Sequence, residues 1–130
     1  MREILFRGKC KNDNEWLYGF PYVTRKNAVK INWYCSEFGS MRTYEVDPET
    51  VGQYTGLTDK NGKKIFEGDL IRSTETGETA IVQWFSEHSA FMIWCKTSNQ
   101  VGFLYECEKS IIEVIGNIHD NPEILKSANP

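Results

Sequence analysis

Hydrophobic and polar residues alternate in short segments along most of the chain, and turn-forming residues interrupt them about every eight to fifteen positions. Alternation with a period of two is typical of strands that bury one face, so the pattern predicts a mostly β protein. In the first part of the chain, strands are expected within residues 4–7, 16–24, 29–34 and 42–46.

The second part of the chain predicts further strands within residues 65–66, 70–73, 80–85, 90–96 and 111–118. Gly116 and Asn117 interrupt the last of these, which indicates a kink. Asn121 followed by Pro122 is typical of a helix start, and we expect a short helix that ends near Lys126.

Small SH3-like barrels show a characteristic order of elements, and this chain has the same order. A strand follows Gly68-Asp69, a polar turn with glycine comes next, and an apolar strand then enters another hairpin. We therefore predict two interdependent parts, an N-terminal β subdomain at residues 1–48 and an SH3-like barrel subdomain with a short C-terminal helix at residues 49–130. This analogy concerns the fold and implies no activity.

The segment GLTDKNGKKIFEGDLIR, residues 56–72, is the most motif-like part of the chain. A calcium loop that starts at Asp59 would need a carboxylate or amide and then a glycine where Lys63 and Lys64 stand. A phosphate loop fails because Gly56 and Gly62 lie one position too far apart. Asn61-Gly62 is instead typical of a type I′ turn, so we predict a hairpin.

The strand within residues 16–24 carries aromatic side chains on one face, namely Trp16, Tyr18, Phe20 and Tyr22. Pro21 cannot donate a ladder hydrogen bond, so this strand should lie at an edge or break near residues 19–21. We favour core filling for these aromatics, and we expect the three remaining tryptophans in the core as well, at Trp33, Trp84 and Trp94.

If that face is exposed instead, its aromatic rings could stack unpaired bases while nearby cations contact phosphates. The candidate binding face then consists of Trp16, Tyr18, Phe20, Tyr22, Arg25 and Lys26. Net charge argues against sequence-independent nucleic-acid binding, because eight Lys/Arg and seven Asp/Glu up to Thr55 give +1, and seven against eleven afterwards give −4.

Composition changes this picture little. The chain has 130 residues, 40% of them hydrophobic and 25% charged, as in ordinary folded domains. Membrane-span and signal-peptide patterns are missing, so we expect a cytoplasmic protein without membrane contact. The four cysteines lie far apart, and we expect free, mostly buried thiols at Cys10, Cys35, Cys95 and Cys107.

Residues capable of catalysis form no recognisable motif. The only histidines, His88 and His119, lack zinc-type spacing to any cysteine. Ser86, Ser89 and Cys95 near His88 could form a nucleophilic site, and Glu67 and Asp69 could act as paired carboxylates, but we favour roles in turns, packing and capping for all of them. We therefore expect no catalytic residue, metal or cofactor.

Three separated motifs carry a family resemblance. They are ETVGQYTGLTDKNGKKIFEGDLI at residues 49–71, VIGNIHDNPEIL at residues 114–125, and FRGK with WLYG at residues 6–9 and 16–19. Together they resemble the YopX family of phage and prophage proteins over nearly the whole chain, with weaker similarity at residues 24–43 and 99–109. The resemblance implies a mostly β fold and a phage context, and it implies no site residues because the activity of the family is unknown.

These observations lead us to expect a non-catalytic binding or assembly module that associates with itself and acts on a phage or host protein. The alternative is single-stranded nucleic-acid binding through the N-terminal aromatic and basic face. An enzyme of unrecognised type is the third hypothesis.

Overall fold

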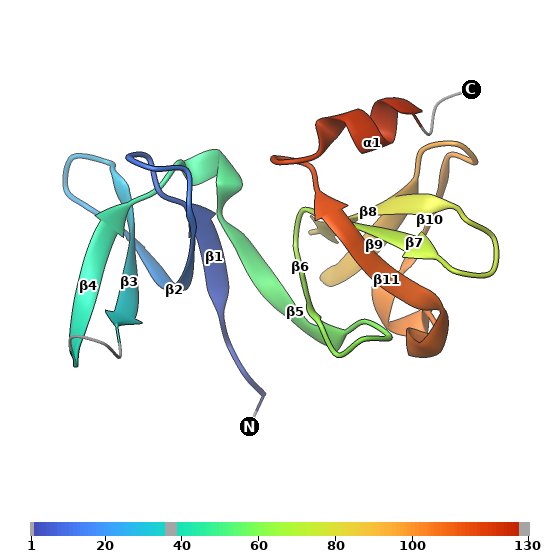
Figure 1. Ribbon diagram of the computed structural model, residues 1–130, viewed down its shortest axis with the longest axis horizontal. Helices are drawn as coiled ribbons and strands as arrows, with labels where there is room; N and C mark the ends of the chain where they lie inside the picture. Colours follow the sequence, from blue (N-terminus) through green and yellow to red (C-terminus); the bar gives the residue numbers. More distant parts are fainter. Residues whose placement is uncertain (1, 36–38, 128–130) are drawn as a thin grey trace. The chain divides into compact units, whose positions relative to one another are not determined.

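The computed structural model describes residues 2–35 and 39–127, and it is mostly β with one short helix, as predicted (Figure 1). The chain divides into two compact units, Met1–Tyr54 and Thr55–Pro130, whereas we expected the boundary after residue 48. Strand β5 (Gly52–Thr58) crosses this boundary. Its first residues pair with β1 through Phe6–Gln53 and Arg7–Gly52, which attaches them to the N-terminal unit.

The N-terminal unit is an antiparallel sheet. Its strands are β1 (Phe6–Lys9), β2 (Trp16–Val23), β3 (Val29–Cys35) and β4 (Ser40–Glu45). The order of the sheet is β4-β3-β2-β1-β5-β6, and its last strand, β6 (Lys64–Phe66), belongs to the C-terminal unit. A 3₁₀ turn, η1 (Pro48–Thr50), precedes β5 and is capped by Asp47. The core centres on Ile31 and Val46, which are fully buried and pack closely over Gly8.

Strand β2 changes its neighbour halfway along. Trp16–Gly19 pairs with β1, and Phe20–Val23 pairs with β3. The strand does not break near residues 19–21, which was one of the two predicted alternatives; it continues from Trp16 to Val23 and exchanges partners between Gly19 and Phe20. Gly19 makes the exchange sterically feasible, because a Cβ atom there would overlap the backbone carbonyl oxygen of Asn32.

The C-terminal unit holds a second antiparallel sheet, with the order β10-β9-β8-β7-β11. The strands of the unit are β6 (Lys64–Phe66), β7 (Asp69–Ser73), β8 (Thr79–Phe85), β9 (Ala90–Cys95), β10 (Gln100–Phe103) and β11 (Ile112–Asn117). Two 3₁₀ turns, η2 (Leu104–Glu106) and η3 (Lys109–Ile111), link β10 to β11. Helix α1 (Pro122–Ser127) follows where a helix was predicted.

The core of this unit lies on one face of the five-stranded sheet and includes Ile65, Ile71, Val82, Leu104 and Ile112. The pairing of β11 with β7 shifts register between Val114 and Gly116, which confirms the predicted kink. The sheet runs from β10 to β11, and no pairing within the described part of the chain closes it into a barrel. The SH3-like barrel therefore stays a prediction.

The hairpin predicted between β5 and β6 is present, but its turn differs from the predicted type. Gly62 has a φ of 80°, whereas Asn61 is not among the described residues with positive φ, so the turn is not type I′. The Gly62 N–H donates to the Asp59 carbonyl and the Asp59 N–H to the Lys63 carbonyl, which is a type I turn followed by a left-handed glycine.

The Asp59 side chain explains this geometry. One carboxylate oxygen accepts the N–H groups of Asn61 and Lys63 at 2.8 and 2.9 Å, and the other accepts the N–H of Val114 at 2.9 Å. These bonds hold the turn and tie it to β11. Asp59 is 1% exposed, and its oxygens are engaged by backbone amides.

The expectation that all three later tryptophans lie in the core is wrong for Trp84, which is 46% exposed. Trp33 and Trp94 are half-buried. Trp84 shares a face with the buried Val82, but it lies near the end of β8, where its ring makes an edge contact with Phe91 at 5.1 Å between ring centroids. Among the described residues, no helix is long and apolar enough to cross a membrane.

Candidate binding surface

The aromatic residues of β2 form an exposed strip. Tyr18, Phe20 and Tyr22 are 44%, 53% and 42% exposed, and Trp16 at the start of the strand is half-buried. We call these four residues the aromatic strip. The core-filling interpretation that we favoured is therefore wrong for the three exposed residues. The opposite face of β2 meets Ile31, so the strip is left on the outward side.

Cross-strand pairs place polar and charged side chains beside the strip, because residues directly opposite in an antiparallel pair share a face. Trp16 lies opposite Lys9, Phe20 opposite Asn32, and Tyr22 opposite Lys30. The Lys9 ammonium lies 5.8 Å from the Trp16 ring centroid. The guanidinium carbon of Arg7, which is buried, lies 4.6 Å from the same centroid.

The next strand extends this face. Asn32 lies opposite Thr43 and accepts its hydroxyl hydrogen bond at 2.8 Å, and Lys30 lies opposite Glu45. Glu45 forms a 2.9 Å ion pair with Lys11, whose hydrogen bond and charge hold the pKa of Glu45 below its ordinary value. The pKa of Lys11 is raised for the same reason. The surface around the strip therefore carries both signs of charge.

Arg25 and Lys26 lie in the turn that joins β2 to β3, and both are exposed. The turn is fixed locally, because the Thr24 hydroxyl accepts the N–H of Ala28 at 3.1 Å and Asn27 adopts a φ of 65°. The two cations therefore lie at the end of the strip, beyond Tyr22 and Val23, and not alongside the aromatic rings.

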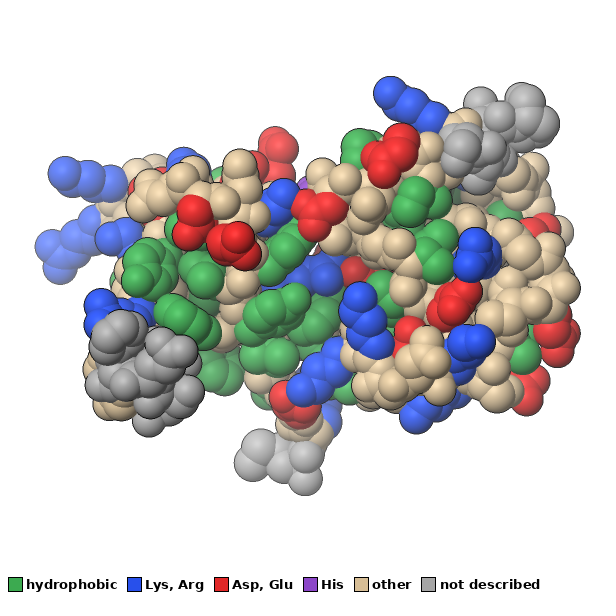
Figure 2. Space-filling view, viewed as in Figure 1, with side chains coloured by type: hydrophobic (Ala, Val, Ile, Leu, Met, Phe, Trp, Pro, Cys, Tyr) green, Lys and Arg blue, Asp and Glu red, His purple; other side chains and the backbone are tan. Residues whose placement is uncertain are grey.

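An apolar hollow of about 420 Å³ adjoins the strip at Tyr22. It is lined by Pro21, Tyr22, Val23, Val29, Pro48 and Val51. Figure 2 shows hydrophobic side chains gathered over the N-terminal strands, on the left of the view, with Lys and Arg side chains at the margin. Pro21, Val23 and Val29 belong to the face of the sheet opposite to the aromatic strip, so the hollow meets the strip only at Tyr22.

Comparison with known proteins identifies the family of the chain. The family model described as YopX protein matches residues 5–126. The chain belongs to the YopX family. The crystal structure of protein EF1440 from Enterococcus faecalis is similar, with a TM-score of 0.61 and 22% identity over 96% of this chain and 99% of that one. The structure of protein yopX from Bacillus subtilis has a TM-score of 0.56 and 14% identity, with the same coverage.

No curated protein matches the chain. At these identities the two structural neighbours support the fold of this YopX protein and nothing finer. The family assignment therefore confirms the resemblance carried by the three sequence motifs.

Of the predicted pair of carboxylates, Glu67 is half-buried and Asp69 is buried. Asp69 is 2% exposed and accepts the Phe66 N–H at 2.7 Å, which is the capping role that we favoured. The pKa of Asp59 would be raised by its burial, but three backbone hydrogen bonds and the charge of Lys63 together lower it. Asp59 and Asp69 therefore both accept hydrogen bonds from backbone N–H groups.

The grouping of Ser86, Ser89 and Cys95 around His88 is not brought together. Ser86 and Ser89 form a turn, with the Ser89 N–H donating to Ser86, whereas Cys95 ends β9, about 20 Å further along an extended strand. The His88 ring packs edge-on against the Phe103 ring, with 5.7 Å between the ring centroids. In the described part of the chain, no three His, Cys, Asp or Glu side chains come together as a metal site would require.

The thiols of Cys10 and Cys95 are buried and free, and that of Cys107 is half-buried and free. The side chain of Cys35 lies outside the described residues. Sequence reasoning missed Met41 and the hollow beside Tyr22. Met41 is 56% exposed on β4, and only the strand registers place it on the same face as Phe20.

Proposed function

We propose that this YopX protein is a non-catalytic binding module that works in the cytoplasm of a phage-carrying cell and contacts a protein partner through the aromatic strip. The observation that carries the proposal is the exposure of Tyr18, Phe20 and Tyr22 at three successive outward positions of one strand. The partner proposed first is a second copy of the chain, and a phage or host protein is the alternative.

The composition of the surface supports a protein partner. Tyr, Phe, Met and Arg are enriched at protein interfaces, and aromatic anchors dominate their energetics. The strip with Met41 provides such anchors, and charges of both signs surround them. The hollow beside Tyr22 is lined by apolar side chains and prolines, which suits a hydrophobic anchor side chain of a partner.

A non-catalytic role is supported by the contacts of two acidic side chains and one histidine. Asp59 and Asp69 accept backbone hydrogen bonds, and His88 packs against an aromatic ring. None of these groups lines the hollow beside the strip.

The test is sedimentation velocity over a wide concentration range with the double variant Phe20→Thr/Tyr22→Thr. Threonine retains strand propensity while removing the aromatic surface. The matched control is Val101→Thr/Tyr105→Thr, which removes two side chains of the C-terminal unit that are 49% and 68% exposed. We expect the wild type and the control to exceed 15.0 kDa as concentration rises, and the strip variant to remain at the monomer mass.

If the wild type stays monomeric, the same variants are compared in affinity capture from phage-carrying cells after nuclease treatment. A protein that the wild type and the control retain and the strip variant loses would identify the partner. Equal capture by all three would overturn the proposal that the strip is the contact surface.

A second candidate is single-stranded nucleic acid, favoured by the cations near the strip, namely Lys9 over Trp16, Lys30 opposite Tyr22, and Arg25 and Lys26 in the adjoining turn. Anisotropy of labelled oligothymidylate tests it. Binding that falls steeply between about 0.05 and 0.2 M salt and is lost in the strip variant would replace the protein-partner proposal.

A further inference from the structure

The C-terminal unit contains a separate pocket whose floor is built by one cross-strand row of side chains. Val114 lies opposite Ile71, Ile71 opposite Ala80, and Ala80 opposite Cys95, so these side chains share the core face of β11, β7, β8 and β9. Two of these four positions, Ala80 and Cys95, carry small side chains, and Val114 lies outside the cavity lining. A depression results over Ala80 and Cys95, beside Ile71.

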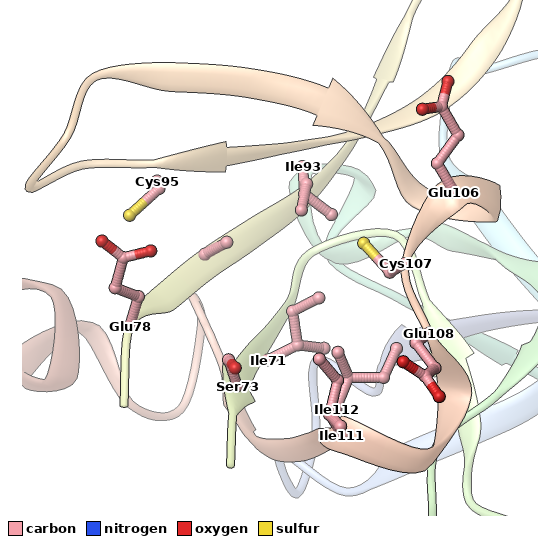
Figure 3. Close-up of a pocket in the computed structure, with 11 residues that line it drawn as sticks. Ile71, Ser73, Glu78, Ile93, Cys95, Glu106, Cys107, Glu108, Ile111 and Ile112 are labelled. Atoms are coloured by element: carbon pink, nitrogen blue, oxygen red, sulfur yellow. The ribbon is translucent and has the colours of Figure 1, made fainter. Parts of the chain in front are cut away.

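The segment from η2 to η3 provides the opposite wall. Cys107 and Ile111 from this segment, with Ile93 of β9 and Ile112 of β11, enclose a cavity of about 410 Å³. That volume falls within the range of small-molecule sites. Figure 3 shows Cys95 and Cys107 on opposite sides of the cavity, with Ile71, Ile111 and Ile112 grouped below Cys107 in the view.

The charged side chains that line the cavity are all acidic. Glu78 enters from the turn before β8, and Glu106 and Glu108 come from the segment that covers the floor. All three are exposed, and Figure 3 shows Glu78 beside Cys95. Glu108 also accepts the Ser110 hydroxyl hydrogen bond at 3.1 Å.

Carboxylates around a cavity with apolar walls create a negative potential at its mouth. An apolar group would be attracted by the isoleucine-lined interior, and a cation would be attracted by the rim. An anion would meet repulsion from all three glutamates. The interior therefore favours the apolar part of a ligand, and the rim favours a cationic group on the same ligand.

We propose that this pocket binds a small apolar molecule that carries a positive charge, of the class of alkylammonium or arylalkylammonium ions. The apolar part lies against Ile71, Ala80 and Ile112, and the cationic group lies at the rim near Glu78 and Glu108. This site is distinct from the aromatic strip, and all of its residues belong to the C-terminal unit.

The experiment is an NMR titration of the full-length protein with three probes of equal chain length, hexylammonium, hexanol and hexanoate. For so small a ligand we expect a dissociation constant of millimolar order for hexylammonium. Amide shifts should concentrate at residues 71, 80, 93, 95 and 112. Hexanol should bind more weakly by about threefold, and hexanoate more weakly still.

Two variants separate the interior from the rim. Ala80→Val fills the depression with a strand-forming side chain and should abolish binding of hexylammonium and hexanol alike. Glu78→Gln/Glu108→Gln should weaken hexylammonium about threefold while leaving hexanol unchanged. The charge control is Gln83→Glu, which lies on β8 outside the cavity lining. It should change the affinity for neither hexylammonium nor hexanol.

Protection of Cys107 from alkylation tests the site without any variant. Hexylammonium should slow iodoacetamide modification of the peptide that contains Cys107 in the wild-type protein, because the thiol lines the cavity. The proposal is overturned if hexylammonium causes no pocket shifts up to about 10 mM, if hexanoate binds equally well, or if Cys107 is not protected at saturation.

Discussion

The carboxylate of Asp59 offers a sharp test of how the C-terminal unit is held together. Replacing Asp59 with alanine removes three hydrogen bonds from backbone N–H groups, at 2.8, 2.9 and 2.9 Å. Hydrogen bonds to a charged acceptor contribute roughly 1.5–3 kcal/mol each, but the turn amides of Asn61 and Lys63 can bond to water once they are released. Counting about 1 kcal/mol for each of these and about 2 for Val114, we expect a loss of about 4 kcal/mol.

The assay is urea denaturation of Asp59→Ala followed by circular dichroism, with Asp13→Ala as the control. Asp13 is exposed and accepts one backbone N–H, that of Glu15, so its replacement should cost no more than about 0.5 kcal/mol. Hydrogen exchange should show loss of protection at the Val114 amide in the Asp59 variant. A stability loss under about 1 kcal/mol with normal Val114 protection would refute the argument.

The same carboxylate predicts a dependence of stability on pH. Hydrogen bonding keeps the folded pKa of Asp59 below its ordinary value, so the folded state favours the ionised form. The stabilisation is fully present above the unfolded pKa of about 3.9 and is lost as pH falls through the folded pKa. Asp59→Asn, which cannot titrate, should therefore lose less stability than the wild type between about pH 5 and pH 2. Equal losses in the two proteins would contradict this assignment.

Further predictions concern single side chains. Phe20→Ala should leave the melting temperature nearly unchanged, whereas Ile31→Ala, at a fully buried position, should cost about 2–5 kcal/mol. Gly19→Ala should prevent or severely weaken folding because its Cβ would overlap a backbone carbonyl, while Gly102→Ala, whose nearest contact would be 3.9 Å away, should be tolerated; thermal unfolding distinguishes these outcomes. Alkylation of Cys107 should reach half its maximal rate at a higher pH than for a free thiol, because burial raises its pKa; a midpoint at or below that of free cysteine would show otherwise.

Several features of the fold could be predicted because they rest on local rules. Alternation located most of the strands but gave no strand at β10 and no bounds for β5. Asn121-Pro122 located the helix, and the glycine in residues 61–62 located the hairpin between β5 and β6. The type of that turn could not be predicted from Asn61-Gly62, because the decisive groups are the Asp59 side chain and its bond to Val114, 55 positions away. The hydrogen bonds accepted by the Asp59 carboxylate therefore outweigh the local preference of Asn61-Gly62 for a type I′ turn.

The aromatic strip, too, was predicted in part from the sequence and decided in part by the tertiary structure. The sequence by itself determined that Trp16, Tyr18, Phe20 and Tyr22 share one face of a strand, since the period of two fixes this. It could not determine whether that face is covered, because burial depends on which elements pack against it. Only the tertiary structure decided that the core forms over Ile31 on the other side of β2 and leaves three of the aromatics exposed.

The pocket of the C-terminal unit depends still more on tertiary structure. Ala80, Cys95 and Cys107 carry no motif, and Glu78, Glu106 and Glu108 are ordinary surface residues in the sequence. Strand registers set Ala80 opposite Cys95, and the 3₁₀ segment places Cys107 across from them. The sequence determined the strands and their alternating faces through local backbone geometry, whereas the exposed strip and the pocket arise from packing between residues far apart in the chain.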